Sequence, residues 1–207
     1  MNYPFIFLIG IIFYSQITFA QESNSSNEME DSSWGLKLGA SRHWQNEGDF
    51  SFASDLGYLG GMYFKKPHGR FIATSYEWQV MQMGYRVKET TIQNLEKIII
   101  NRTYIQTLFN FHVTPVRFID ISFGLYGGIA VNSNEEWHFT SEVDVKDEEQ
   151  NLRQLDVGAK FNISFWLNRI GLGLEYYHGF VNTDTETGPD FVFTNRAISL
   201  SAKYIMK

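Results

Sequence analysis

The chain has 207 residues, a formal net charge of −6 at pH 7 and no cysteine. The acidic balance excludes a protein that binds nucleic acid through a basic surface, and the lack of cysteine excludes disulfides as a source of stability. After the first twenty residues no stretch is apolar enough for a transmembrane helix, so a helical membrane protein is excluded as well.

The start of the chain has the features of a secretory signal peptide. An apolar run at Phe5–Phe13 is followed by polar residues and by Thr18–Ala20, with small side chains at positions −3 and −1 of a cleavage site. The run is shorter than the roughly 18–20 residues of a spanning helix, so an uncleaved membrane anchor is the less favoured alternative. We predict a signal peptide at 1–20, a flexible polar leader at 21–33 and one domain at 34–207.

Eight segments of alternating apolar and polar side chains follow in chain order. Because successive side chains of a strand point to opposite faces, each segment is predicted to be a strand with one apolar and one polar face. The clearest, Gln154–Leu167, is longer than the roughly 9–11 residues that a tilted strand needs to cross a bilayer. The predicted strands are Trp34–His43, Leu56–Lys65, Phe71–Val87, Thr103–Val113, Phe118–Val131, Gln154–Leu167, Ile170–Val181 and Phe193–Met206.

The connections between these strands alternate in length. Three are short turns and four are long polar loops, at 65–70, 114–117 and 168–169, and at 45–55, 88–102, 132–150 and 182–190 respectively. Short turns at one rim and long loops at the other are typical of outer-membrane barrels, whose turns are periplasmic and whose loops are extracellular. We therefore predict an all-β fold, an eight-stranded antiparallel up-and-down transmembrane β-barrel in the outer membrane, with both termini periplasmic.

Alternation alone does not say which face points inward, because a lipocalin-like barrel in water has the reverse arrangement. The polar face is rich in glycine, which suits a narrow interior, and its charges of both signs can pair across a lumen but not across lipid. We therefore place it inside and expect a plugged interior. The predicted interior polar residues are Lys37, Glu77, Asp120, Asp156, Lys160, Glu175 and Lys203. The predicted lipid-facing residues are Ile119, Ile121, Phe123, Leu155, Val157, Phe161, Ile163, Phe165, Leu172, Leu174, Ile198 and Leu200.

This assignment has an energetic consequence. Arginine in place of Ile121 or Phe161 would cost about 2–4 kcal/mol if these positions lie near the bilayer midplane, whereas replacing Lys160 by alanine would cost much less. Two places depart from simple alternation: the second strand carries large apolar groups on both faces, and Leu108 falls on the otherwise polar inner face of the fourth.

Four strand segments rich in glycine or small residues carry a resemblance to a known family: Trp34–Ala40, Phe123–Gly128, Leu155–Phe161 and Asn195–Ser201. They resemble the small outer-membrane β-barrel proteins common in the Bacteroidetes, the porin-like or PorT-like group, over the whole mature chain. The resemblance implies fold and location, and no single activity, because members differ in function. Such barrels usually end in an aromatic residue, whereas this chain ends in the segment Tyr204–Lys207.

The acidic loop at 132–150 offers carboxylates that calcium could bind. It lacks the Asp-x-Asp-x-Asp-Gly spacing of a dedicated calcium site, so a solvated loop is the favoured interpretation. Trp137 and Phe139 within it are equally compatible with contact to a ligand and with a β-hairpin above the membrane.

A hydrolase needs a nucleophile, a base and an orienting acid close together. His178 lies three residues after Glu175, so the two side chains point to opposite faces of a strand. His112 shares a predicted inner face with Tyr104, Gln106 and Asn110, which favours a hydrogen-bonded interior histidine. We expect no catalytic residue, no metal site and no cofactor.

The predicted function is that of a non-enzymatic outer-membrane barrel with a structural, secretion-accessory or loop-mediated binding role. Its expected partners are outer-membrane lipid, lipopolysaccharide and the outer-membrane assembly machinery, with no nucleic acid. One alternative is a soluble periplasmic lipocalin-like barrel that carries an apolar ligand and stays in the aqueous fraction without detergent. Another is a narrow pore for small solutes, which would give discrete conductance steps.

Overall fold

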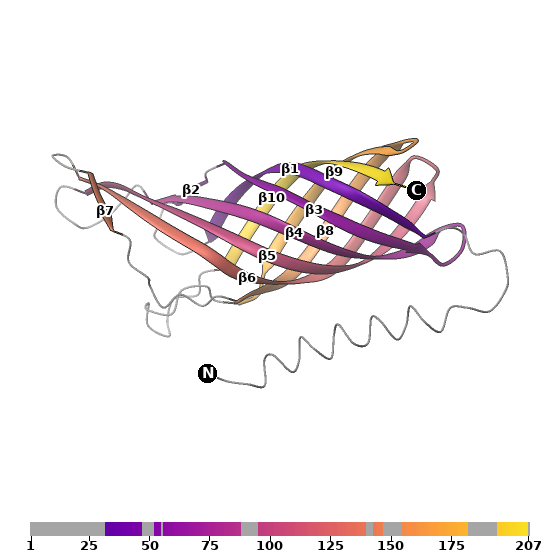
Figure 1. Cartoon of the computed structure of the whole chain (residues 1–207), viewed down its shortest axis with the longest axis horizontal. Helices are drawn as coiled ribbons and strands as arrows, with labels where there is room; N and C mark the ends of the chain where they lie inside the picture. Colours follow the sequence, from indigo (N-terminus) through magenta and orange to yellow (C-terminus); the bar gives the residue numbers. More distant parts are fainter. Residues whose placement is uncertain are drawn as a thin grey trace, which may run out of the picture. The chain divides into compact units, whose positions relative to one another are not determined.

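The structure, a computed structural model, describes residues 32–46, 52–54, 56–87, 95–139, 143–146, 155–181 and 194–206. The predicted signal peptide and nearly all of the leader lie outside these residues. Ten strands form one antiparallel sheet within them (Figure 1): β1 (Ser33–Asn46), β2 (Phe52–Ser54), β3 (Leu56–Pro67), β4 (Ile72–Val87), β5 (Leu95–Val116), β6 (Ile119–Phe139), β7 (Val143–Lys146), β8 (Leu155–Leu167), β9 (Ile170–Gly179) and β10 (Thr194–Met206). No helix in this part of the chain has the length and hydropathy that a membrane crossing requires.

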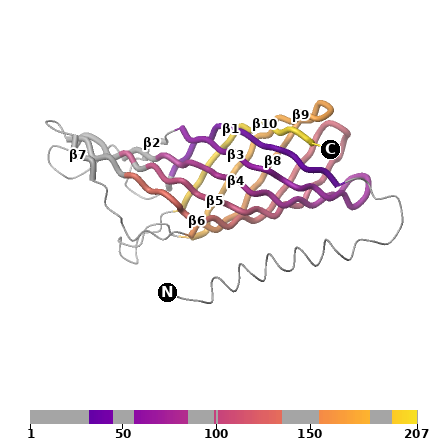
Figure 2. The backbone as a smooth tube through the Cα atoms, in the orientation of Figure 1, coloured from indigo at the N-terminus to yellow at the C-terminus, as the bar shows by residue number. Residues whose placement is uncertain are grey.

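Eight of the strands close into a barrel, which confirms the predicted fold. The order β4-β3-β1-β10-β9-β8-β6-β5 returns on itself because β5 also pairs with β4. The first and last strands form the closing seam, in which Trp34 lies opposite Met206 and Asn46 opposite Thr194. They lie side by side in the tube drawing (Figure 2). Closure pairs the backbone of every barrel strand on both sides, which is the condition for strands to cross a bilayer.

Two strands are much longer than the sequence predicts. β5 has 22 residues and β6 has 21, so parts of the predicted loops at 88–102 and 132–150 are strand. A register shift between Thr103 and Tyr104 marks the point beyond which β5 and β6 continue past their predicted ends, and over this stretch β5 still pairs with β4 up to Val87. These extensions pair with each other and also with β4 and β7, but their sequence lacks the alternation that marks a strand with one buried face. β7 pairs with β6 from Glu135 to His138, which confirms the β-hairpin alternative for this segment.

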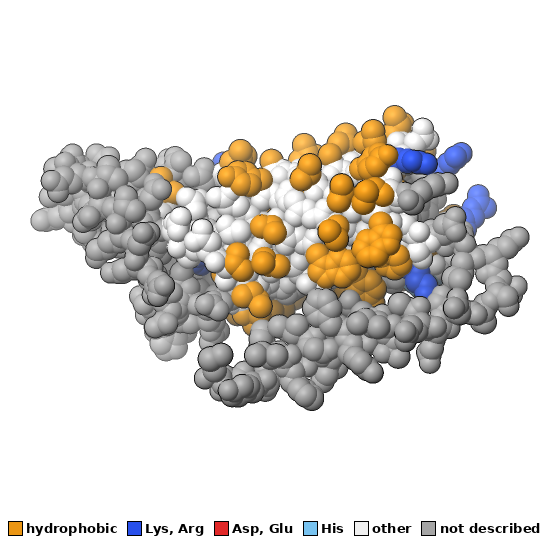
Figure 3. Space-filling view, viewed as in Figure 1, with side chains coloured by type: hydrophobic (Ala, Val, Ile, Leu, Met, Phe, Trp, Pro, Cys, Tyr) orange, Lys and Arg blue, Asp and Glu red, His pale blue; other side chains and the backbone are white. Residues whose placement is uncertain are grey.

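The inner and outer faces of the barrel follow the predicted alternation. Polar side chains at alternate positions are buried, and the apolar ones between them lie on the outer surface, seen as orange groups in Figure 3. Of the twelve residues predicted to face lipid, eight are exposed and four, Ile119, Ile121, Leu155 and Val157, are half-buried. Leu108 and Leu59 do lie inside, in a cluster with six other side chains: Met81, Met83, Tyr104, Tyr126, Tyr177 and Ala197.

Glycine lets neighbouring strands and interior rings approach closely. A Cβ at Gly158 would overlap the backbone carbonyl oxygen of His178 and would lie 2.6 Å from the ring of Tyr126. Gly127 is only one strand away, since its register partner is Val157, yet a Cβ there would meet nothing within 4 Å. The two glycines therefore make a matched pair for mutation: packing requires glycine at position 158 but not at position 127.

We expect Gly158→Ala to lower the free energy of unfolding by about 1–3 kcal/mol, the usual cost of overpacking. Gly127→Ala should change it by no more than about 0.5 kcal/mol, as for other substitutions that touch nothing. Denaturant unfolding in the same detergent measures both. Equal effects of the two substitutions would contradict the packing described for the interior.

Candidate functional site: the charged interior of the barrel

The centre of the barrel holds a network of five buried charges. Each comes from a different strand, Lys37 from β1, Glu77 from β4, Lys160 from β8, Glu175 from β9 and Lys203 from β10. All five residues are 6% exposed or less. They are far apart in sequence and meet because each occupies an inward position of its strand, so their side chains converge across the lumen.

Glu175 is the hub of this network. Its carboxylate oxygens lie 3.3 Å from the Nζ of Lys37, 3.2 Å from that of Lys160 and 3.1 Å from that of Lys203. It also accepts hydrogen bonds from the Tyr177 hydroxyl at 2.5 Å and from the Ser201 hydroxyl at 2.9 Å. A buried carboxylate is stable only when it is paired and hydrogen-bonded, and Glu175 is both.

Glu77 is the second acceptor. Its Oε2 accepts hydrogen bonds from the Nζ of Lys37 at 2.6 Å and from the Nζ of Lys160 at 2.8 Å. Its other oxygen accepts a hydrogen bond from the amide of Asn110 at 2.9 Å. Three lysines and two glutamates therefore share one site, with one positive charge in excess.

The network also spans the seam where the barrel closes. Lys37 and Lys203 lie directly opposite each other in the pairing of β1 with β10. Like charges in this position repel and weaken a strand pair. Glu175 contacts both ammonium groups, and Lys203 donates two further hydrogen bonds, to Asn162 Oδ1 and Ser164 Oγ, each at 3.1 Å. The carboxylate thus turns a repulsive cross-strand pair into a bridged one.

A second cluster lies toward the short turns and contains Ser75, His112, Asp120 and Lys65. The Ser75 hydroxyl is 2.8 Å from His112 Nε2, and His112 Nδ1 is 2.9 Å from Asp120 Oδ1. Lys65 forms an ion pair with Asp120. This serine, histidine and aspartate order is the one used by serine hydrolases.

The cluster has the connectivity of a hydrolase triad but not its access. Ser75 is 1% exposed, and its oxygen also accepts a hydrogen bond from Asn110 at 3.2 Å. A nucleophile needs room for the reacting carbonyl beside it, whereas Ser75 is enclosed by its neighbours. Asp120 was predicted to lie on the inner face, but its meeting with His112 and Ser75 depends on the register of three strands, which no local pattern in the sequence encodes.

The remaining predicted interior residue, Asp156, lies toward the long loops. It accepts a hydrogen bond from Asn195 Nδ2 at 3.1 Å and one from the Tyr126 hydroxyl at 3.4 Å. All seven predicted interior residues are thus buried, five of them in one network. Among the described residues no group of three His, Cys, Asp or Glu side chains could hold a metal ion. The acidic side chains of the 132–150 loop lie outside the described side chains.

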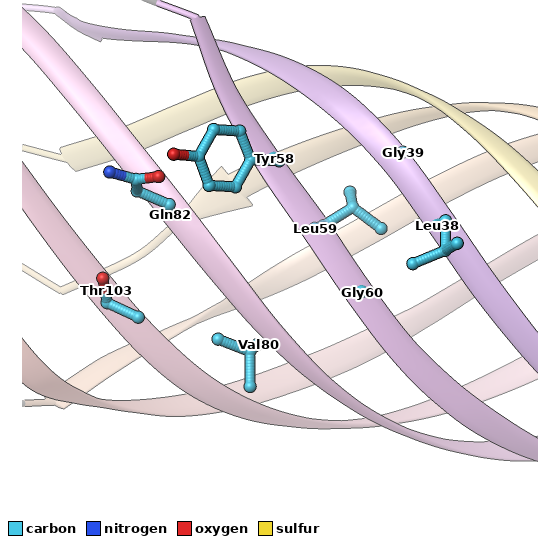
Figure 4. Close-up of a pocket in the computed structure, with 8 residues that line it drawn as sticks. All are labelled: Leu38, Gly39, Tyr58, Leu59, Gly60, Val80, Gln82 and Thr103. Carbon is cyan, nitrogen blue, oxygen red and sulfur yellow. The ribbon is translucent and has the colours of Figure 1, made fainter.

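A cavity of about 400 Å³ lies on the outer surface (Figure 4), and its lining is mostly apolar. Gly60 leaves the space between Leu38, Tyr58 and Val80, whose side chains are exposed. Its polar lining comes from Gln82, Thr103 and the Tyr58 hydroxyl (Figure 4). The cavity contains no acid, base or nucleophile pair, so the sequence-predicted charges and this cavity are separate features.

A closed barrel with an apolar outer surface and a filled, charged interior defines an outer-membrane β-barrel protein. A family described as "outer membrane protein beta-barrel domain" matches residues 19–185, and the chain belongs to this family. Its place is accordingly the outer membrane. No curated protein matches the sequence.

Several solved structures have a similar fold. Ail, the attachment invasion locus protein of Yersinia pestis, is 9% identical, with 84% of this chain and 97% of that chain covered and a TM-score of 0.45. Neisserial surface protein A is 8% identical, with 84% of this chain and 99% of that chain covered and a TM-score of 0.48. OprG of Pseudomonas aeruginosa is 11% identical, with 84% of this chain and 94% of that chain covered and a TM-score of 0.36.

The charge balance of the network predicts which of its members contributes most to stability. Glu175→Gln leaves three lysines around one glutamate, and we expect it to lower the free energy of unfolding by about 3–5 kcal/mol, as when one partner of a buried ion pair is lost. Lys160→Met leaves two lysines with two glutamates, so its cost should be less than half as large. The small cost expected for Lys160→Ala therefore does not extend to Glu175.

Urea unfolding of both variants in the same lipid vesicles, followed by tryptophan fluorescence, measures these costs. Glu175→Ala is a useful third variant, because it removes the side chain as well as the charge. A larger loss for Lys160→Met than for Glu175→Gln would contradict the description of Glu175 as the hub.

Proposed function

We propose that this protein is a non-enzymatic anchor that holds a binding surface outside the cell. The observation that carries the proposal is the filled interior, in which three lysines and two glutamates pair across the lumen. Such an interior supports a rigid plug rather than a path for solutes. The apolar outer band supports contact with lipid on all sides, with the twelve residues predicted to face lipid as its members.

The long ribbon beyond the barrel supports a binding role over a purely structural one. β5 and β6 have 22 and 21 residues, about twice the roughly 9–11 needed to cross a bilayer. They continue past the predicted strand ends, with β4 paired beside β5 up to Val87 and β7 paired with β6 at the far end (Figure 1). A paired ribbon projects rigidly, so it can present a surface to a partner at little entropic cost.

We further propose the orientation that the unequal connections support. The short turns of the barrel would be periplasmic, together with both termini, and the long connections would be extracellular. In this orientation the outer surface near the long loops meets lipopolysaccharide, and the assembly machinery acts from the side of the turns. The glycine-containing strand segments named above support a finer assignment to the porin-like or PorT-like group of Bacteroidetes barrels.

The interior also weighs against the alternative functions. A carrier of an apolar ligand needs an apolar cavity inside, whereas the interior charges here lie at hydrogen-bond distance from one another. A hydrolase needs substrate access to Ser75, whose hydroxyl is enclosed. A pore needs a continuous water path, which the network obstructs.

Single cysteines test the proposed orientation, because the chain has none of its own. We expect Asp144→Cys in β7 to react with a membrane-impermeant maleimide in intact cells. His68→Cys, in the exposed turn between β3 and β4, should react only after the outer membrane is made permeable. The unchanged chain provides the background. Labelling of His68→Cys but not Asp144→Cys in intact cells would contradict the orientation.

A further inference from the structure

The rim formed by the short turns carries a regular pattern of arginines. Each of the three turns contains one: Arg70 between β3 and β4, Arg117 between β5 and β6, and Arg169 between β8 and β9. All three side chains are exposed. Lys and Arg groups gather at this end of the molecule, drawn in blue in Figure 3.

No acid on the described surface neutralises these arginines. The carboxylates whose side chains the structure describes, Glu77, Asp120, Asp156 and Glu175, are all buried and engaged inside the barrel. The Arg70 guanidinium lies 5.3 Å from the centre of the Phe71 ring, a contact that leaves its charge without a carboxylate partner among the described residues. In the part of the chain that the structure describes, the rim is therefore positive, although the chain as a whole is acidic.

The arginines sit at the edge of the apolar band. In each turn the next residue is a large exposed apolar one, Phe71 at 51%, Phe118 at 47% and Ile170 at 58% exposed. Phe118 packs on Phe165 of β8, with ring centres 5.4 Å apart, so the band reaches the rim itself. A cation one residue beyond the last lipid-facing side chain lies at the depth of lipid headgroups, where basic side chains extend toward the interface.

We propose that Arg70, Arg117 and Arg169 form a ring that binds the phosphate groups of anionic phospholipids in the periplasmic leaflet. The proposal rests on the orientation given under the proposed function. Guanidinium groups match phosphate with two parallel hydrogen bonds, and basic groups near a bilayer surface attract anionic lipid. Contacts at three of the turns would hold the short rim level with the headgroups and set the depth of the barrel.

The test uses the folded protein in phosphatidylcholine vesicles and the tryptophans of the outer surface. Trp34 is exposed and lies at the end of β1 that is near the short turns. Its fluorescence is therefore quenched when brominated lipid lies close to this rim. We expect brominated phosphatidylglycerol to quench about threefold more effectively than brominated phosphatidylcholine at equal mole fraction, as a local excess of anionic lipid requires.

Two matched variants locate the effect. R70Q/R117Q/R169Q should lose the preference for phosphatidylglycerol, because the charges are gone. R70K/R117K/R169K should keep part of it, because lysine retains the charge but not the paired hydrogen bonds. Both variants should still shift on boiling in a gel, since none of the interior ion pairs among the described residues involves a rim arginine.

Equal quenching by the two lipids in a wild-type protein that shifts on boiling would overturn the ring and leave the proposed function intact. A wild-type protein that shows no shift on boiling would overturn the proposed function itself. Loss of the preference in millimolar inorganic phosphate, but not in sodium chloride of equal ionic strength, would mean that the ring takes a free anion, and would overturn the assignment to lipid.

Discussion

The contact between Glu175 and three lysines is the constraint around which the rest of this barrel is arranged. Eight strands leave an interior wide enough only for side chains, so whatever points inward must pair with what points inward from the other strands. Lys37 and Lys203 face each other across the closing seam, and both are buried. One carboxylate that bridges both, and Lys160 as well, allows the seam to close.

The same constraint explains the composition of the two faces. A charged interior requires close approach of the strands around it, which glycine at positions such as Gly158 allows. Apart from the inner cluster around Leu59 and Leu108, the large apolar side chains of the described strands lie on the outer surface, where lipid or another apolar medium can cover them. The inner network and the outer band are therefore two consequences of one pattern with a period of two residues.

That period is also what made the fold predictable. Alternation assigns Lys160 and Glu175 to one face and Phe161 and Leu174 to the other, and the structure has them so. It even placed Leu108 inside against its polar neighbours. The contacts between interior residues could not be derived, because they depend on the stagger of eight strands around a closed barrel, which no local pattern in the sequence encodes.

The errors have a physical origin as well. The added lengths of β5 and β6 were not predicted because their sequence lacks the alternation that marks a strand with one buried face, although they pair with each other and with β4 and β7. The cluster of Ser75, His112 and Asp120 was not predicted, because its members come from three strands and only the register of these strands brings them together. Ser75 is buried and accepts a hydrogen bond from Asn110, so the connectivity of a catalytic triad does not by itself make an active site.

The central claim is that a paired, charged interior and an apolar exterior make this chain a closed barrel in a membrane. The most direct measurement compares boiled and unboiled detergent extracts of the membrane fraction on a gel. The account predicts a protein that is recovered only with detergent and migrates differently after boiling, because the closed barrel resists unfolding until heated. A protein that is recovered in the aqueous fraction and shows no shift on boiling would contradict it.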